Sequence, residues 1–279
     1  VRDLLVSASL RPLILGIAIT LTFPLFSAWR WRAIMDGLGQ PLTLGEAFTF
    51  IMACWPLTTF TPSKGGDLAR AWFLRGRSPV SLVLGSVLAE RLIDVLVLLG
   101  FCLAGSLWFG WDLLAGASGG LLAAGLAGTA ILLAVRLPIP EKFRPKVERL
   151  LLALRVILAR PGLLAFVLVV TIANWMASVV QTWLFYRALG AAAPFGSVLA
   201  ALPAAIFVGL IPVTLMGMGT RDAALIRLLA PVAPAPVSLG AGLLYSLCGY
   251  WLPGVAGIPF LRHALGRPGR RSPEIPPSN

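Results

Sequence analysis

Apolar runs of about 20 residues or longer constrain this chain more than any other feature. They are Leu10–Trp29, Val80–Trp111, Leu113–Val135, Leu163–Leu189 and Val237–Leu261. A helix of about 20 residues is about 30 Å long, which matches the hydrocarbon thickness of a bilayer. Only 12% of the residues are charged, whereas soluble domains have about 25%. The sequence therefore predicts an all-α polytopic membrane protein with about five full spans, and it excludes a soluble enzyme, a nucleic-acid-binding module and a disordered chain.

Two further apolar segments, about 44–74 and 198–229, are short and interrupted. The first is broken at Pro62-Ser63-Lys64-Gly65-Gly66-Asp67-Leu68-Ala69-Arg70, and the second between Pro212 and Gly217-Met218-Gly219-Thr220-Arg221-Asp222. Because Pro and Gly end helices, we predict two re-entrant broken hairpins that enter the membrane and turn back. Both follow the order short helix, Pro, Gly-containing break, charged cluster, short helix. This order favours an inverted repeat, whose breaks meet near the midplane around a substrate site, over two unrelated breaks.

The basic loops predict the orientation. The segment 136–160 is rich in Lys and Arg, and its apolar residues recur at helical spacing, so we predict an amphipathic helix on the cytoplasmic leaflet. If Arg30-Trp31-Arg32 marks a cytoplasmic boundary of the first span, the basic loops and the tail all fall on one side. The first residues then lie outside, which predicts a further span upstream. We expect one transmembrane domain over residues 1–265 and a basic, Pro-rich tail over 266–279.

Several charged residues lie within the apolar stretches. Lys64, Gly65, Gly66, Asp67 and Arg70 form the first break, Gly217, Gly219, Arg221 and Asp222 form the second, and Glu90, Arg91 and Asp94 interrupt the run between 80 and 111. A charge at membrane depth costs roughly 2.5–3.5 kcal/mol, so such groups have partners or a function. We predict that the breaks bind a lipid headgroup, because backbone N–H groups and arginines favour phosphate. The alternative is a structural ion-pair network, with Arg70 bound to Glu90 and Arg221 to Asp94.

Other chemistry is not expected. Cys54, Cys102 and Cys248 stand alone in apolar stretches, and His263 is the only histidine. From these residues we expect no disulfide framework, no metal site and no catalytic triad. We also expect no cofactor. Neither break has the order of residues that a nucleotide-binding loop requires.

The motifs taken together resemble a known family. Arg30-Trp31-Arg32, the segment from Thr61 to Arg70, Glu90-Arg91-Leu92-Ile93-Asp94 and the segment from Pro212 to Asp222 occur in the order seen in the lysylphosphatidylglycerol synthase transmembrane-domain family. The resemblance implies a flippase-like protein of the bacterial or archaeal cytoplasmic membrane, whose two breaks line a lipid path. Asp222 stands where the family usually has Glu. The soluble aminoacyl-transferase domain is not in this sequence, so we do not expect the chain to make the lipid by itself.

These observations give one leading hypothesis and two alternatives. The leading one is a transporter, not an enzyme, that moves a phospholipid or a lipid-linked polyprenyl-phosphate or glycolipid headgroup between leaflets. The first alternative is a non-transporting membrane partner or scaffold of a lipid or glycan synthase, and the second is a membrane-embedded enzyme acting on lipid phosphate. The expected partners are membrane lipids, anionic or phosphate-bearing, together with such a synthase and a second copy of the chain. Nucleic acid is not an expected partner.

Overall fold

The computed structural model describes residues 8–134, 140–210, 214 and 217–266, with the backbone alone for residues 62–64. Every regular element in this part of the chain is a helix. Pro212, the start of the predicted amphipathic segment and the tail beyond residue 266 lie outside the described residues.

Within the described residues, five helical segments are long and apolar enough to cross a membrane. They are α2 and α3 together (Leu10–Ile19 and Thr22–Gly37), α6 (Val80–Phe109), α7 (Asp112–Ala134), α9 (Pro161–Ala188), and α12, η3 and α13 together (Ala235–Ser246, Leu247–Trp251 and Leu252–Leu265). Their bounds agree with the predicted spans within a few residues, except at the end of the first. That span continues to Gly37, beyond the expected boundary at Trp29, because Arg30 is buried inside the protein.

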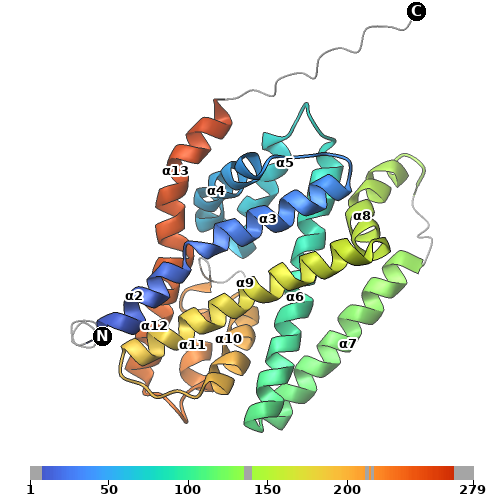
Figure 1. Ribbon diagram of the computed structural model, residues 1–279. Coiled ribbons are helices and arrows are strands. Elements are labelled where there is room, and N and C mark those ends of the chain that lie inside the picture. Colours follow the sequence, from blue (N-terminus) through green and yellow to red (C-terminus); the bar gives the residue numbers. More distant parts are fainter. Residues whose placement is uncertain (1–7, 135–139, 211–213, 215–216, 267–279) are drawn as a thin grey trace, which may run out of the picture.

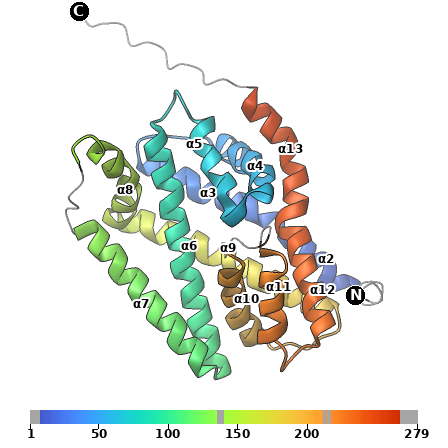
Figure 2. The same cartoon turned by 180° about the vertical axis from the view of Figure 1, so that it is seen from behind.

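The shorter helices form two pairs at opposite ends of the molecule. One pair is α4 (Leu44–Phe60) and α5 (Ala69–Phe73), joined by the 3-10 segment η1 (Pro62–Leu68), and the other is α10 (Phe195–Gly209) and α11 (Thr220–Leu228). Figures 1 and 2 show the first pair in the half of the molecule that contains α8 (Arg144–Ala159) and the second pair in the opposite half. The chain enters and leaves each pair on the same side of the molecule.

Local sequence explains where the first pair begins and how it turns. Thr43 and Glu46 form a capping box at the start of α4, in which each side chain accepts a hydrogen bond from the other residue's backbone N–H. After α4, the backbone N–H of Gly66 donates to the Thr61 hydroxyl over 2.8 Å. A Cβ on Gly66 would lie 2.2 Å from the backbone nitrogen of Thr58. Only glycine therefore allows η1 to fold back against the end of α4.

Each pair packs on the long helix that follows the other pair. Helix α4 lies on α13, and α10 lies on α6. Glycine permits both contacts, since a Cβ on Gly257 would lie 2.3 Å from the Met52 carbonyl oxygen, and one on Gly105 would lie 2.4 Å from the Ala200 nitrogen. Small residues bring membrane helices close in this way. The two halves of the chain are thus connected by reciprocal contacts.

The π-helical turn η3 is tied to α4 by side chains. Pro253 has no N–H, so the Gly249 carbonyl lacks the α-helical donor four residues later. The indole nitrogen of Trp55 donates to this carbonyl over 3.1 Å, and the Thr59 hydroxyl lies 3.4 Å from the next one, that of Tyr250. These bonds fix the middle of the last span against the first pair of short helices.

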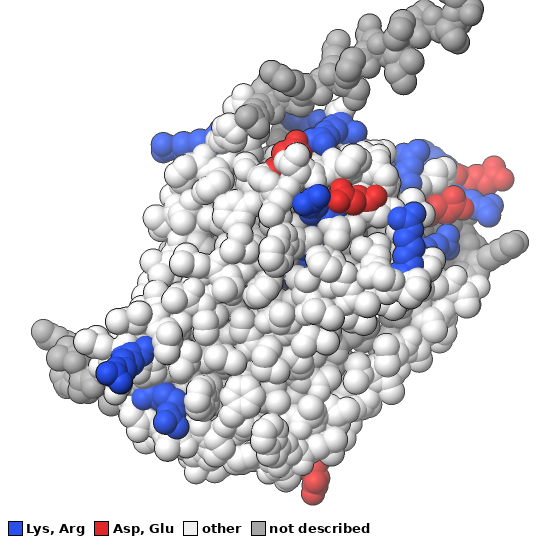
Figure 3. Space-filling view, viewed as in Figure 1, with Lys and Arg blue, Asp and Glu red and all other residues white. Residues whose placement is uncertain are grey.

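Charge on the surface is concentrated at one end. Figure 3 shows a broad uncharged belt between a cluster of basic and acidic side chains at the top and a few charged side chains at the opposite end. The exposed basic residues of α8, the α5–α6 loop and the end of α13 include Arg75, Arg77, Arg144, Lys146, Arg149, Arg155 and Arg262. Helix α8 is amphipathic as predicted. Its buried residues Ala153, Leu154 and Ile157 pack into a cluster with residues of α3, α6 and α9.

Candidate functional site

Helix α6 places an acidic pair deep inside the protein. Glu90 and Asp94 are four residues apart and therefore lie on one face of the helix; they are 0% and 4% exposed. They lie about 15–21 Å from the start of a helix that is about 45 Å long. The pair is thus near the middle of the span, where a carboxylate needs a partner.

Arg30 is the central partner of this pair. Its guanidinium binds Asp94 at 2.6 Å, Glu90 at 3.1 Å and the Thr171 hydroxyl at 2.9 Å. The sequence pattern predicted that Arg30 marks the membrane boundary. This prediction was wrong, because the span continues to Gly37 and the buried Arg30 side chain pairs with Asp94 near the middle of α6. A signal was present: Arg32 has Asp36 four residues later and forms an exposed pair with it. Arg30 has no such local carboxylate, so it required a distant one.

The first break completes the network. Arg70 binds Glu90 and lies 3.5 Å from Asp67, with its guanidinium 5.1 Å from the centre of the Trp31 ring. The pair between Arg70 and Glu90, which belongs to the alternative of a structural ion-pair network, is therefore confirmed. Arg91 bridges Asp67 at 3.4 Å and Asp94 at 3.3 Å. Among the described residues, the network joins three arginines (Arg30, Arg70 and Arg91) to three carboxylates (Asp67, Glu90 and Asp94).

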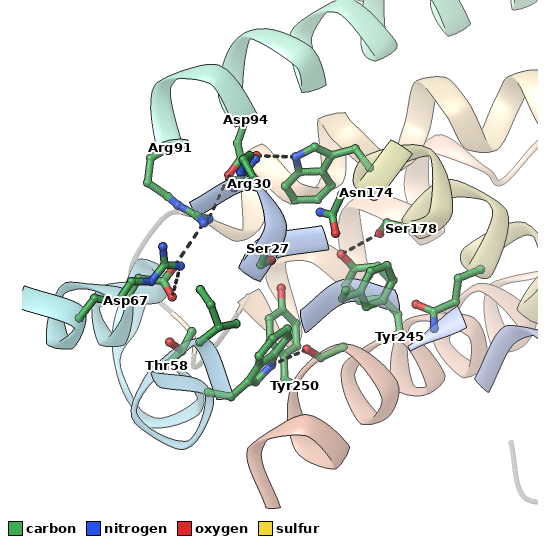
Figure 4. A pocket seen from close by; sticks show the side chains of 17 residues that line it. Ser27, Arg30, Thr58, Asp67, Arg91, Asp94, Asn174, Ser178, Tyr245 and Tyr250 are labelled. Atoms are coloured by element: carbon green, nitrogen blue, oxygen red, sulfur yellow. Dashed lines mark hydrogen bonds and ion pairs between the residues drawn. The ribbon is translucent and has the colours of Figure 1, made fainter. Parts of the chain in front are cut away.

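A cavity of about 100 Å³ lies beside this network (Figure 4). Arg30, Asp67, Arg70, Arg91 and Asp94 form its charged wall. Helix α9 contributes Asn174, Trp175, Ser178 and Gln181, α4 contributes Trp55 and Thr58, and the last span contributes Tyr245, Gly249 and Tyr250. A cavity of this volume has room for several water molecules, or for a small polar group. Both halves of the chain therefore build one polar cavity between apolar helices.

Residues of the second break lie behind the cavity wall. Arg221 is 2% exposed and binds Asp222 at 2.7 Å, the Ser246 hydroxyl at 2.7 Å and the Gly242 carbonyl at 3.1 Å. Its guanidinium lies 4.5 Å from the centre of the Tyr245 ring, and Tyr245 lines the cavity. The alternative pairing of Arg221 with Asp94 was wrong, because Arg221 is paired with its neighbour Asp222 while Arg30 and Arg91 bind Asp94.

The glycines of the breaks shape the backbone. Gly217 has a φ of +71° and Gly219 one of +92°, both in the left-handed region that favours glycine. Asp222 accepts a hydrogen bond from the Gly219 N–H over 3.1 Å, at the start of α11. Gly65 lies beside Thr61. Lys64 belongs to η1, and its side chain lies outside the described part of the structure.

Polar side chains on α9, in α12 and in η3 extend the site beyond the predicted residues. Asn174 and Gln181 were visible as amides within an apolar run, which is the signal that could have placed them here. Tyr245 and Tyr250 gave no such signal, because aromatic residues are ordinary in spans. No group of His, Cys, Asp and Glu that could hold a metal ion occurs among the described residues.

Fold and site together define a multi-pass helical membrane protein with a polar cavity that is lined by its spans and by the first pair of short helices. The sequence matches the family described as the lysylphosphatidylglycerol synthase TM region over residues 1–257, and the chain belongs to this family. No curated protein matches the sequence significantly.

Proposed function

We propose that this protein is a lipid transporter of the flippase type, which moves a lipid headgroup between the two leaflets without itself catalysing a reaction. The observation that carries the proposal is the cavity, which brings charged and hydrogen-bonding side chains together at the middle depth of long apolar helices. Polar groups at this depth are tolerated where they line a substrate path. The acyl chains of the lipid would remain in the bilayer while its headgroup passed through the cavity.

The proposed architecture has two re-entrant hairpins in an inverted repeat. The α4–η1–α5 and α10–α11 pairs are short, and each contains a proline within its first helix, Pro56 and Pro203. Each pair begins and ends on one side of the molecule, and the two pairs do so on opposite sides (Figures 1 and 2). Their reciprocal packing on α13 and α6 supports this repeat, because a two-fold relationship would produce the same contact twice. Alternating access would then follow from motion of one half against the other.

The breaks have different roles in this proposal. Asp67 and Arg70 meet the headgroup directly, with Lys64, Gly65 and Gly66 at the adjoining turn. Gly217, Gly219, Arg221 and Asp222 control the position of Tyr245 from behind. Glu90, Arg91 and Asp94 hold the arginines in place as the headgroup passes. The proposed setting is the cytoplasmic membrane of a bacterium or archaeon, with a lipid or glycan synthase as the proposed protein partner and self-association as a further proposal.

Filling the cavity tests the proposal. Asn174 is partly exposed on the cavity wall, so Asn174→Trp should occupy the path with little disturbance of the surrounding core. The matched control is Ala124→Trp on the exposed surface of α7. Purified proteins reconstituted in vesicles are assayed for movement of fluorescent phospholipid and glycolipid analogues between leaflets, and for thermal stability.

We expect wild type and Ala124→Trp to transport, and Asn174→Trp to lose at least about tenfold in rate while it remains folded. Equal transport by the folded Asn174→Trp variant would contradict a path through the cavity. Failure of folded wild type to move either analogue would instead favour the scaffold alternative.

A further inference from the structure

The charged wall of the cavity is balanced. Arg30, Arg70 and Arg91 offset Asp67, Glu90 and Asp94, so the formal charge of the network is zero. A ligand with a net charge would add an uncompensated charge to this buried site, and uncompensated buried charges are strongly unfavourable. The balance therefore favours a ligand without net charge.

The rest of the wall is uncharged but rich in hydrogen-bonding groups. On this uncharged part of the wall, three buried polar atoms have no hydrogen-bond partner among the described residues: Thr58 Oγ1, Asn174 Oδ1 and Gln181 Oε1. Thr58 and Gln181 are 6% and 0% exposed, and all three residues line the cavity. On the charged part, the Nε atoms of Arg70 and Arg91 have none either, and a hydroxyl oxygen could accept from them. Buried polar groups are nearly always paired, so these atoms indicate a ligand that supplies hydroxyl or similar groups.

Aromatic rings stand between these polar groups. Trp55, Tyr245 and Tyr250 line the same space from α4 and from the last span, and Figure 4 shows Thr58 and Asn174 around it. Aromatic faces are apolar, with polar atoms only at their edges. A ring with C–H faces and peripheral hydroxyl groups has the same pattern, and this is the chemistry of a sugar.

We propose that the cavity takes an uncharged, polyhydroxylated group such as the sugar of a glycolipid, and that Asp67 sets this preference. The inference rests on the proposed function, since it assumes that the cavity receives a lipid headgroup. Asp67 lies between Arg70 and Arg91, at 3.5 and 3.4 Å, and its side chain is 15% exposed. Glu90 is fully buried and does not line the cavity, whereas Asp67 and Asp94 both do. The Asp94 side chain is only 6% exposed and is held by Arg30 and Arg91, so Asp67 is the more accessible of the two carboxylates that neutralise the arginines of the cavity.

Changing the charge balance tests the proposal. The purified protein, in a detergent without a sugar headgroup, is titrated with monoglucosyldiacylglycerol or phosphatidylglycerol, and bound lipid is measured by native mass spectrometry. Asp67→Asn leaves a net charge of +1, Asp67→Asn with Arg91→Gln restores zero, and Arg91→Gln alone leaves −1. Asp112→Asn, at the exposed start of α7, is the matched control.

We expect wild type, the control and the double variant to bind the glucolipid at least about tenfold more tightly than phosphatidylglycerol, which corresponds to about 1.4 kcal/mol. Asp67→Asn should reverse this order, and Arg91→Gln should gain affinity for a cationic lipid, ethylphosphatidylcholine. Free glucose and inorganic phosphate are titrated in parallel. Equal affinity for glucose and for the glucolipid would support a sugar as the ligand of the cavity, and it would identify this ligand as a free sugar.

Preference of wild type for phosphatidylglycerol or for the cationic lipid would overturn the proposal. So would an unchanged order in a folded Asp67→Asn variant. If that variant does not fold, the neutral double variant and Arg91→Gln decide the question by the same criteria. Transport is measured separately: phosphatidylglycerol transport without glucolipid binding would refute only this inference, whereas glucolipid binding without transport of any lipid would refute only the proposed function.

Discussion

Arg30 holds together residues that are far apart in the sequence. It binds Asp94, 64 positions later, and Thr171, 141 positions later, and so connects α3 with α6 and α9. Its role follows from the planar guanidinium, which offers several donors in fixed directions and stays charged at depth. A lysine in its place could not reach all of these acceptors.

We predict that Arg30→Gln destabilises the protein by about 3–5 kcal/mol, because it leaves two buried carboxylates short of a partner. Adding Asp94→Asn should recover a large part of the loss. Arg32→Gln, which removes an exposed pair on the same helix, should change stability by no more than about 0.5 kcal/mol. Thermal unfolding and the yield of folded protein in detergent measure all three. Equal effects of the Arg30 and Arg32 substitutions would contradict this assignment.

At the scale of the element, helix α6 depends on a close approach to α10. Gly105 lies against the backbone of Leu199 and Ala200, whereas Gly100, on the same helix, has no neighbouring atom within 4 Å of its Cβ position. Gly105 and Gly100 therefore lie in the same helix but differ in whether another helix packs against them.

We therefore predict opposite results for the same substitution. Gly105→Ala should destabilise the protein by about 1–3 kcal/mol, because the added methyl group overpacks the contact. Gly100→Ala should be neutral or stabilising by up to about 1 kcal/mol, because alanine is the better helix former. Thermal unfolding of the two variants is the measurement, and similar shifts in both would show that helix propensity outweighs packing.

The cap of α4 makes its start sensitive to pH. Partial burial by itself would raise the pKa of Glu46, but hydrogen bonds from the Thr43 backbone and Arg77 stabilise the carboxylate more, so its pKa is lowered. A carboxyl with a lowered pKa stabilises the folded state above its ordinary pKa and loses this effect as the pH falls.

We expect the difference in thermal stability between wild type and Glu46→Gln to be largest near neutral pH. It should shrink as the pH falls through the ordinary value of 4.5. Thr43→Ala should cost about 1 kcal/mol at neutral pH, which is typical for the loss of an N-cap. A difference between wild type and Glu46→Gln that grows in acid would contradict the sign of the pKa shift.

At the scale of the whole molecule, the distribution of charge sets the orientation. Exposed basic residues gather at the end that contains α5 and α8 (Figure 3). From the positive-inside rule, we predict that this end lies in the cytoplasm. Since α6 begins at this end and spans the membrane, Asp112 at the start of α7 should lie on the outer side.

Cysteine labelling checks this orientation in intact cells. In a background without Cys54, Cys102 and Cys248, a membrane-impermeant reagent should label Asp112→Cys. It should not label Arg149→Cys or Arg262→Cys until the membrane is opened. The reverse pattern would invert the topology and place α8 outside.

The sequence by itself determined the class of fold and the spans. The length and the charge content of an apolar segment can be read from that segment alone. Each such segment is stable in lipid as a helix without contacts to the others. The effect of proline and glycine on a helix is also local, so these residues predicted the break between α4 and α5 near residues 62–68. The pair between Arg70 and Glu90 was also predictable, because both residues stand within apolar stretches close to one another in the chain.

Only the tertiary structure decided which residues share the cavity. Arg30 was misplaced at the boundary, and Arg221 was paired with the wrong carboxylate, because the partner of a buried charge depends on which helix faces meet. Tyr250 belongs to the π turn of the last span, which is hydrogen-bonded to Trp55 and Thr59, and Tyr245 precedes this turn in α12; both line the cavity. Which side chains meet depends on helix packing, that is, on contacts between residues far apart in the sequence. The sequence of one helix does not indicate which face of a neighbouring helix it will contact.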